Sequence, residues 1–149
     1  MVTTVADRIF IDTNILVFAS LPLSSMYRAA HAALHEIGKQ NTEAWVSRQV
    51  LREYLVQITR PGTIPAGSPV TASAQVATMQ SLFRVADETP IVTDHLLDLL
   101  RTIGAAGKQI HDANIVATMQ VNQIPRLLTN NVKDFKRYSH LITVVPLEP

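Results

Sequence analysis

The chain alternates short apolar runs with longer segments in which apolar residues recur at helical spacing. The short runs have the length of buried strands, and several are rich in Ile, Val, Phe or Trp, which favour strands. The predicted strands lie at residues 9–11, 44–46, 84–87, 126–129 and 142–145. The longer segments are amphipathic and predict helices. The predicted helices lie at residues 15–20, 26–37, 50–58, 72–83, 93–103 and 111–122.

Capping and turn-forming residues mark several of the boundaries. Ser24 and Ser25 are suited to cap the second predicted helix, and Pro61 ends the third. A turn or short helix through Phe135 leads to the last strand. The stretch 60–73 is rich in Pro, Gly and Ser, and we predict a surface loop there rather than a linker between domains, because neither flank could fold alone.

This order of elements predicts the fold class. Parallel strands need crossover connections, so strands separated by helices indicate a parallel sheet with helices on both faces. We therefore expect an α/β fold, a three-layer α/β/α sandwich around a mainly parallel five-stranded sheet. The 149 residues suit a single domain, 1–149, and a domain of this size buries about two thirds of its unfolded surface.

The composition narrows the classes of function. The chain has no cysteine, which excludes a disulfide framework, a thiolate zinc site and a thiol nucleophile, and fits a reducing cytosol. The apolar runs are too short to cross a bilayer, and the N-terminus has no charged segment leading into a long apolar one, so we expect a soluble cytoplasmic protein with no membrane partner. The net charge is +1, so binding of nucleic acid would depend on a local patch.

Asp12 directly follows the first predicted strand, and Thr13 and Asn14 come after it. The carboxyl ends of parallel strands form the edge where ligands bind, so an acid at this point is a candidate for holding a metal or a phosphate. Asp is also a favoured N-cap, and Asp12 precedes the helix predicted at 15–20. These residues alone leave both interpretations open.

Asp112 is the second informative carboxylate. At about 100° per residue it shares a helix face with Ile115, Val116 and Met119, in the first turn and on the side toward the core. A buried carboxylate in that place needs a cation, a hydrogen-bond network or a proton. The alternative is an N-cap role. We expect the neighbouring His111 to be a packing or surface residue rather than a ligand.

Other polar residues give weaker signals. Glu53 falls roughly 130° from the centre of the apolar stripe of its helix, so the pattern predicts a surface acid. Thr129, Asn131 and Asp134 follow the fourth predicted strand and form another polar cluster at a carboxyl end. Asn is well suited to a turn, and Asp134 could be a helix cap, so a structural role is the alternative here too.

These carboxyl-end positions carry more information together than singly. Asp12, Asp112 and the Asn131/Asp134 group are all expected at one edge of a parallel sheet, where their side chains could converge. Oxygen ligands without His or Cys suit a hard cation such as Mg²⁺ or Mn²⁺. Clustered carboxylates repel one another and are stable when ionised mainly around such a cation.

Four segments, in order along the chain, carry a resemblance to a known family. They are FIDTN with Asp12, REYL with Glu53, IHDANIVATM with Asp112, and LLTNNVKDF. In these segments the chain resembles the PIN domain family, and within it the VapC-type toxin ribonucleases. The resemblance implies a five-stranded parallel sheet between helices, with Asp12, Glu53 and Asp112 as an acidic triad that holds Mg²⁺ or Mn²⁺. It also implies that Asn14 orients the site and that Thr129 supplies a hydroxyl beside a fourth position.

The chain departs from the family at that fourth position. Where the family usually has an acid, after Thr129 and Asn130, this chain has Asn131. An amide oxygen can accept a hydrogen bond from a water on the metal but brings no charge, so a second metal would bind more weakly or not at all. Asp134 matches the acid of the family's DF pair and could compensate in part.

The expected function is that of a metal-dependent endoribonuclease, in which a cation held by the triad lowers the pKa of a water that attacks phosphorus. The resemblance implies an RNA substrate, a cognate antitoxin protein as partner, and a homodimer. Four basic residues near the motif segments are candidates for contacts with the RNA backbone. They are Arg52, Lys133, Lys136 and Arg137.

Two other functions stay open. The first is a PIN-like module that binds RNA or a partner without cutting, which the amide of Asn131 favours. The second is a phosphotransfer or phosphatase domain with Asp12 as nucleophile. Domains of this kind that are related to haloacid dehalogenases need a second Asp two positions later, where this chain has Asn14.

Overall fold

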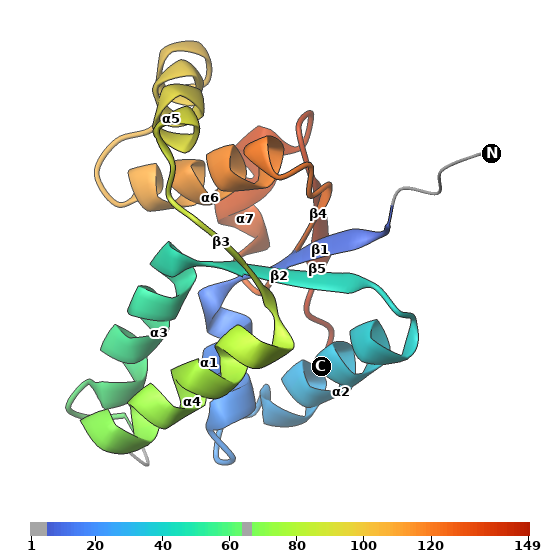
Figure 1. Ribbon diagram of the computed structural model, residues 1–149, viewed down its shortest axis with the longest axis vertical. Helices are drawn as coiled ribbons and strands as arrows, with labels where there is room; N and C mark the ends of the chain where they lie inside the picture. The colour runs from blue at the N-terminus through green and yellow to red at the C-terminus, as the bar shows by residue number, and fades with distance from the viewer. Residues whose placement is uncertain (1–5, 64–66) are drawn as a thin grey trace.

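A computed structural model describes residues 6–63 and 67–149 of the chain. Five strands in this part form one sheet in the order β3-β2-β1-β4-β5, and every neighbouring pair is parallel (Figure 1). The strands are β1 (Arg8–Ile11), β2 (Glu43–Ser47), β3 (Arg84–Ala86), β4 (Arg126–Thr129) and β5 (Thr143–Pro146). All five predicted strands are present, and their ends differ from the predictions by at most one residue.

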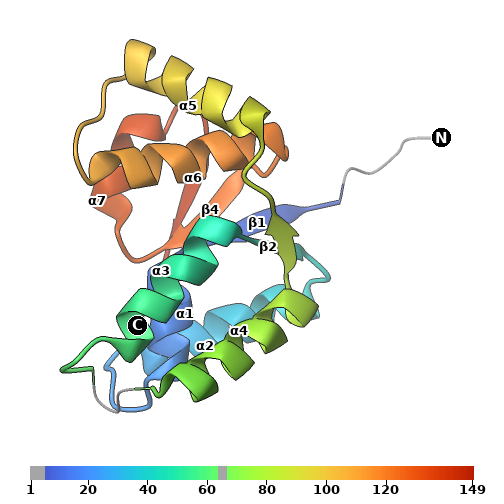
Figure 2. The ribbon, with the colours of Figure 1, turned by 60° about the vertical axis from the view of Figure 1, so that its left-hand side comes forward.

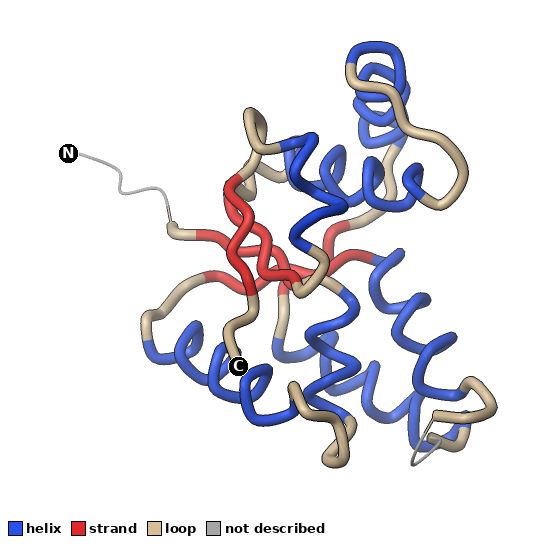
Figure 3. The backbone as a smooth tube through the Cα atoms, turned by 180° about the vertical axis from the view of Figure 1, so that it is seen from behind, coloured by secondary structure: helices blue, strands red, loops and turns tan. Residues whose placement is uncertain are grey.

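Helices cover both faces of the sheet. Figures 1 and 2 show α5, α6 and α7 on one face and α1 to α4 on the other, and Figure 3 shows the strands as a thin middle layer seen from behind. The helices are α1 (Thr13–Ser20), α2 (Tyr27–Lys39), α3 (Arg48–Thr59), α4 (Pro69–Leu82), α5 (Pro90–Thr102), α6 (Gln109–Val121) and α7 (Val132–Phe135), and a 3-10 turn, η1 (Lys136–Tyr138), follows α7. The arrangement confirms the predicted α/β sandwich with a parallel five-stranded sheet.

The central strand β1 holds the core together. Phe10 is fully buried and lies in register between Trp45 of β2 and Leu127 of β4. Both faces of a central parallel strand are covered, which explains why residues 9–11 form a continuous apolar run rather than an alternating one. The fold is therefore organised around the strand that ends at Asp12.

The sheet has a topological switch point between β1 and β4. The strands β1 and β4 are neighbours, but β1 leads into α1 on one face of the sheet and β4 leads into α7 on the other (Figure 1, Figure 2). Open parallel sheets bind ligands in the crevice at such a point, beyond the carboxyl ends of the strands. The topology thus places Asp12 and Thr129 side by side at this crevice.

Some predicted boundaries were wrong. The loop predicted at 60–73 is shorter, because α4 begins at Pro69, where proline suits the first turn, and the Ser68 hydroxyl accepts a hydrogen bond from the Thr71 amide at 3.1 Å. Residues 64–66 of that predicted loop lie outside the described residues. The helix predicted from residue 93 begins three residues earlier for the same reason, at Pro90.

The predicted capping of the second helix by Ser24 was also wrong. The Ser24 hydroxyl accepts a hydrogen bond from the Met26 amide in the turn before α2, and not from an amide inside the helix.

In residues 6–63 and 67–149, no helix is both long enough and apolar enough to cross a membrane.

Candidate active-site cleft

Asp12 caps α1, and its side chain also lines a cleft. The β1 ladder extends to it through a hydrogen bond from the Asp12 amide to the Leu128 carbonyl at 3.0 Å. One carboxylate oxygen, Oδ1, accepts a hydrogen bond from the Thr13 amide at 2.7 Å, which caps the helix. The two interpretations left open by the sequence are therefore compatible, because the capping bond occupies only one lone pair of one oxygen.

The second carboxylate oxygen of Asp12 is held from β4 and α1. Oδ2 accepts hydrogen bonds from the Thr129 hydroxyl at 2.7 Å and from the Asn14 amide nitrogen at 2.9 Å. Asn14 is itself fixed, since its side-chain oxygen accepts from the Asn130 amide at 3.0 Å. Asp12 is only 5% exposed. Burial raises its pKa above the usual value, and the bonds from Thr129, Thr13 and Asn14 oppose that rise without cancelling it.

Glu53 reaches the same cleft from α3. Its carboxylate accepts hydrogen bonds from the Thr13 hydroxyl at 2.9 Å and from the Gln49 side-chain amide at 2.8 Å. The side chain is half-buried, so the surface position predicted from the helical pattern was wrong. The helical pattern locates Glu53 only relative to the apolar stripe of α3. It could not show that the start of α1 packs over the polar flank of α3 on which Glu53 lies.

Asp112 lies in the first turn of α6 and is half-buried. It is not the N-cap, which is Lys108, so the capping alternative was wrong. Burial, together with the charges of Asp12, Asp134 and Glu53, raises the pKa of Asp112 to about 6, and the charge of His111 opposes the rise. Three other carboxylates are thus close enough to disfavour the ionised form of Asp112.

These side chains line one cleft of about 280 Å³. Its walls include Asp12, Asn14, Glu53, Asp112 and Asn131, so it brings together most of the polar residues singled out in the sequence. Two of the predicted residues lie elsewhere. Thr129 is fully buried behind Asp12, and Asp134 is exposed on α7 outside the lining of the cleft.

The donor chemistry of the cleft fits a hard divalent cation. Its ionisable lining groups are all carboxylates, whose oxygens are the ligands that Mg²⁺ and Mn²⁺ prefer. Within the described ranges, however, no three acidic or histidine side chains stand close enough together to hold a metal as they are. Asp112 accepts no hydrogen bond from the described residues, so it is the carboxylate least restrained from turning toward Asp12 and Glu53.

The sequence analysis did not identify two residues of this hydrogen-bond network, Gln49 and Asn114. The Gln49 amide nitrogen donates to Glu53 and also to the His111 carbonyl at 3.0 Å, and the Gln49 oxygen accepts from Asn114 at 2.7 Å. Gln49 is 5% exposed and joins α3 to α6 beside the cleft through these bonds to His111 and Asn114. Its position four residues before Glu53 puts both on one helix face, and this spacing is the only signal of its role in the sequence.

The basic residues suggested by the sequence differ in their surroundings. Arg52 pairs with Glu88 through two contacts of 3.0 Å, and Arg137 donates to the Gly104 carbonyl and to Gln109. The other two, Lys133 and Lys136, are exposed on α7 and η1 and do not line the cleft.

Comparisons with known proteins extend these observations. No curated protein sequence matches the chain. VapBC2 of Rickettsia felis, solved bound to a DNA fragment from its promoter, has a TM-score of 0.67 at 18% identity, covering 95% of this chain and 99% of the other. VapC20 of Mycobacterium tuberculosis has a TM-score of 0.61 at 19% identity, covering 80% and 86%. A toxin–antitoxin complex from Klebsiella pneumoniae has a TM-score of 0.67 at 22% identity, covering 93% and 97%.

At these identities the solved structures show a shared fold. The family model for the PIN domain matches residues 9–141, which extend from β1 to the last residues before β5. This range contains all four segments on which the resemblance was based. The chain therefore belongs to the PIN domain family.

Proposed function

We propose that this protein is a metal-dependent endoribonuclease and the toxin of a toxin–antitoxin pair. The observation that carries the proposal is that Asp12, at the end of β1, meets Glu53 of α3 and Asp112 of α6 in one cleft at the carboxyl edge of the sheet. The PIN domain match supports a nuclease, since the family consists largely of nucleases. The similar VapC20 of Mycobacterium tuberculosis is described as a toxin that cleaves the sarcin–ricin loop.

Asp12, Glu53 and Asp112 would hold Mg²⁺ or Mn²⁺. Such an ion supplies Lewis acidity toward the phosphodiester and toward an attacking water. One divalent ion neutralises two of the three negative charges of these carboxylates, so its binding strongly reduces the cost of having all three ionised. Asn131 adds an amide oxygen without charge at the cleft, which does not favour a second ion.

The residues of the chain set the positions of these oxygens. Thr129, Asn14 and the Thr13 amide fix the Asp12 carboxylate in one orientation. The Thr13 hydroxyl holds Glu53 next to it. This pre-organisation matters because a site that is already oriented has less to rearrange during the reaction.

The proposed reaction is a hydrolysis. A water attacks phosphorus in line with the bond to the 3′ oxygen, the new phosphorus–oxygen bond forms, and the bond to the 3′ oxygen breaks. The water loses a proton and the leaving 3′ oxygen gains one, so the products are a 5′-phosphate and a 3′-hydroxyl.

The partner proposed for the chain is an antitoxin protein. Two of the solved structures with this fold, from Rickettsia felis and Klebsiella pneumoniae, are complexes of a toxin with its antitoxin. From the resemblance to the VapC-type members of the family, we also propose that the chain forms a homodimer. A neighbouring reading frame whose product copurifies with this chain and suppresses its activity would support the pairing.

One observation favours a second candidate, a PIN-like module that binds RNA without cutting. The cleft has an amide, Asn131, at the position of a family acid, and its described carboxylates are not yet close enough to bind a metal together. A cleavage assay separates the two candidates.

The experiment uses purified protein and a pool of structured RNA, with Mg²⁺ or Mn²⁺ and with a chelator. Asp12→Asn and Asp112→Asn remove ligands from the cleft, and Asp94→Asn removes the same charge from an exposed position on α5. Cleavage that needs the metal, is lost in both cleft variants and persists in Asp94→Asn supports the nuclease. If all forms are inert and RNA binding is retained, the binding module replaces it.

A further inference from the structure

A second hollow adjoins the acidic cleft along α3. This groove has a volume of about 430 Å³ and lies between α3 and the start of α6. Glu53 and Gln57 line both the groove and the cleft, so the two hollows share a wall. A flexible polymer that enters the cleft can therefore continue into the groove without leaving the surface of the protein.

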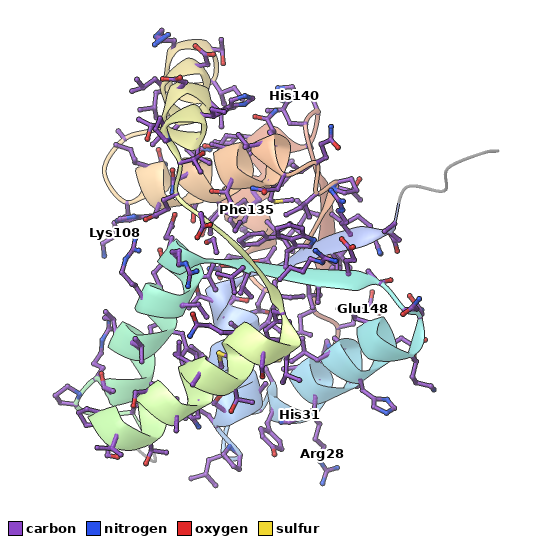
Figure 4. All side chains as sticks on the ribbon, in the orientation of Figure 1. Arg28, His31, Lys108, Phe135, His140 and Glu148 are labelled. Carbon is purple, nitrogen blue, oxygen red and sulfur yellow. The ribbon has the colours of Figure 1, made fainter. Side chains whose placement is uncertain are left out.

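The groove is basic where the cleft is acidic. Arg52 and Arg60 come from α3 and its C-cap, and Lys108 comes from the N-cap of α6. Figure 4 shows Lys108 at the end of α6 nearest α3. Among the described residues that line the groove, Glu53 alone is acidic, and His111 adds a ring that can stack or donate a hydrogen bond.

Two of these cations are available for a ligand. Arg52 is already paired with Glu88. Arg60 and Lys108 are exposed and form no ion pair with any side chain of the described residues. Two such cations facing one groove concentrate positive charge that nothing in this part of the chain neutralises.

We propose that this groove binds the phosphate backbone of an RNA strand beside the bond to be cut, with Arg60 and Lys108 as the phosphate contacts. The inference rests on the proposed nuclease function, because it takes the acidic cleft as the place of cleavage. The cleft repels phosphates through its carboxylates, so neighbouring cations are needed to hold the flanking nucleotides while one phosphodiester lies among the acids. The exposed Val56, at 59%, offers an apolar contact to a base or ribose in the same groove.

The inference also assigns the RNA strand a path over the protein surface. The sequence analysis did not single out Arg60 or Lys108, and its candidates for phosphate contacts included Lys133 and Lys136. These two line neither the groove nor the cleft, and the neighbouring Arg137 is held by Gly104 and Gln109. The strand should therefore run from the cleft toward α3 and the start of α6, and not across α7.

The test compares two variants with the same loss of charge. One is Arg60→Gln with Lys108→Gln in the groove, and the other is Lys133→Gln with Lys136→Gln on the α7 side. Binding of a short fluorescein-labelled single-stranded RNA is measured by fluorescence anisotropy in chelator, from roughly 0.05 to 0.2 M salt. Polyglutamate serves as an acidic polymer without phosphates, and cleavage of the RNA pool is measured on the same proteins.

We expect the groove variant to bind RNA roughly 25-fold more weakly at about 0.1 M salt, and its salt slope to fall by about 1.4, since a single-stranded phosphate contact contributes about 0.7 to that slope. The α7-side variant should change affinity less than about 3-fold, because its cations lie outside both hollows. Cleavage efficiency should follow affinity in both variants.

Four results separate the inference from the function on which it rests. If wild type binds no RNA, if both variants lose affinity equally, or if the groove variant loses polyglutamate and not RNA, the groove is not an RNA site. The third result would make it a docking site for an acidic protein segment. If the expected difference in RNA binding holds and no protein cuts, the groove stands and the nuclease proposal falls.

Discussion

Replacing Asp112 with Asn should make the metal-free protein more stable at neutral pH. The folded state raises the pKa of this carboxyl from 3.8 to about 6, so ionising it costs more in the folded chain than in the unfolded one. A difference of about 2.2 pKa units corresponds to at most about 3 kcal/mol, and screening of this half-exposed group by solvent reduces that to roughly 1–2 kcal/mol. Asn has nearly the same shape and no charge, so it avoids this cost.

The pH dependence has a definite sign. A carboxyl whose pKa is raised on folding favours the folded state fully below the unfolded pKa, and this contribution is lost as the pH rises through the folded pKa. Asp112→Asn should therefore match wild type below pH 3.8, gain on it as the pH rises, and exceed it in stability fully above pH 6 to 7, the window set by the shift from 3.8 to about 6. Urea unfolding at about pH 3 and about pH 8, in chelator, measures the difference at both ends.

A matched control and a metal titration make the result decisive. Asp94→Asn, at an exposed position on α5, should change the free energy of unfolding by less than about 0.5 kcal/mol at either pH. Saturating Mn²⁺ should stabilise wild type more than Asp112→Asn, because a ligand that binds only the folded state adds to its stability. The reasoning is refuted if, in chelator, Asp112→Asn is no more stable than wild type at pH 8.

Three further substitutions test single contacts. Thr129→Val removes the buried donor to Asp12, so the free energy of unfolding in urea should fall by about 1–3 kcal/mol and the affinity for Mn²⁺, measured by calorimetry, should fall as well. Gln49→Leu removes the partner of the Asn114 amide and one of the two donors to Glu53, and should lower stability by a similar amount while Gln80→Leu, at an exposed position on α4, does not. Tyr138→Phe removes a buried hydroxyl that has no hydrogen-bond partner in the described residues, so thermal unfolding should show equal or higher stability, and a clear loss would mean that the hydroxyl is bonded after all.

The parts of this protein that the sequence predicts well depend on local chemistry. The apolar run at 9–11 and the acid after it are enough to place Asp12 at the carboxyl end of a buried strand. Likewise, the periodicity around Ile115 and Val116 identifies α6 and puts Asp112 in its first turn. In both cases the information lies within a few residues, where helix and strand periods apply.

The parts that it predicts poorly depend on distant contacts. Glu53 is drawn into the cleft by Thr13, 40 positions earlier, and Gln49 bonds to Asn114, 65 positions later. Helical periodicity sorts a residue only by the apolar stripe of its own helix, so it cannot register a polar neighbour supplied by another element. Only the resemblance to the PIN domain family drew attention to Glu53, and nothing drew attention to Gln49.

The bond between Thr129 and Asp12 has a consequence for how the protein is made. It joins positions 117 residues apart, and it forms only when β4 has docked beside β1. During synthesis the carboxylates of Asp12, Glu53 and Asp112 all leave the ribosome before Thr129 does. The cleft is therefore completed late, and an incomplete chain that ends before β4 carries every proposed metal ligand without the hydroxyl that fixes the central one.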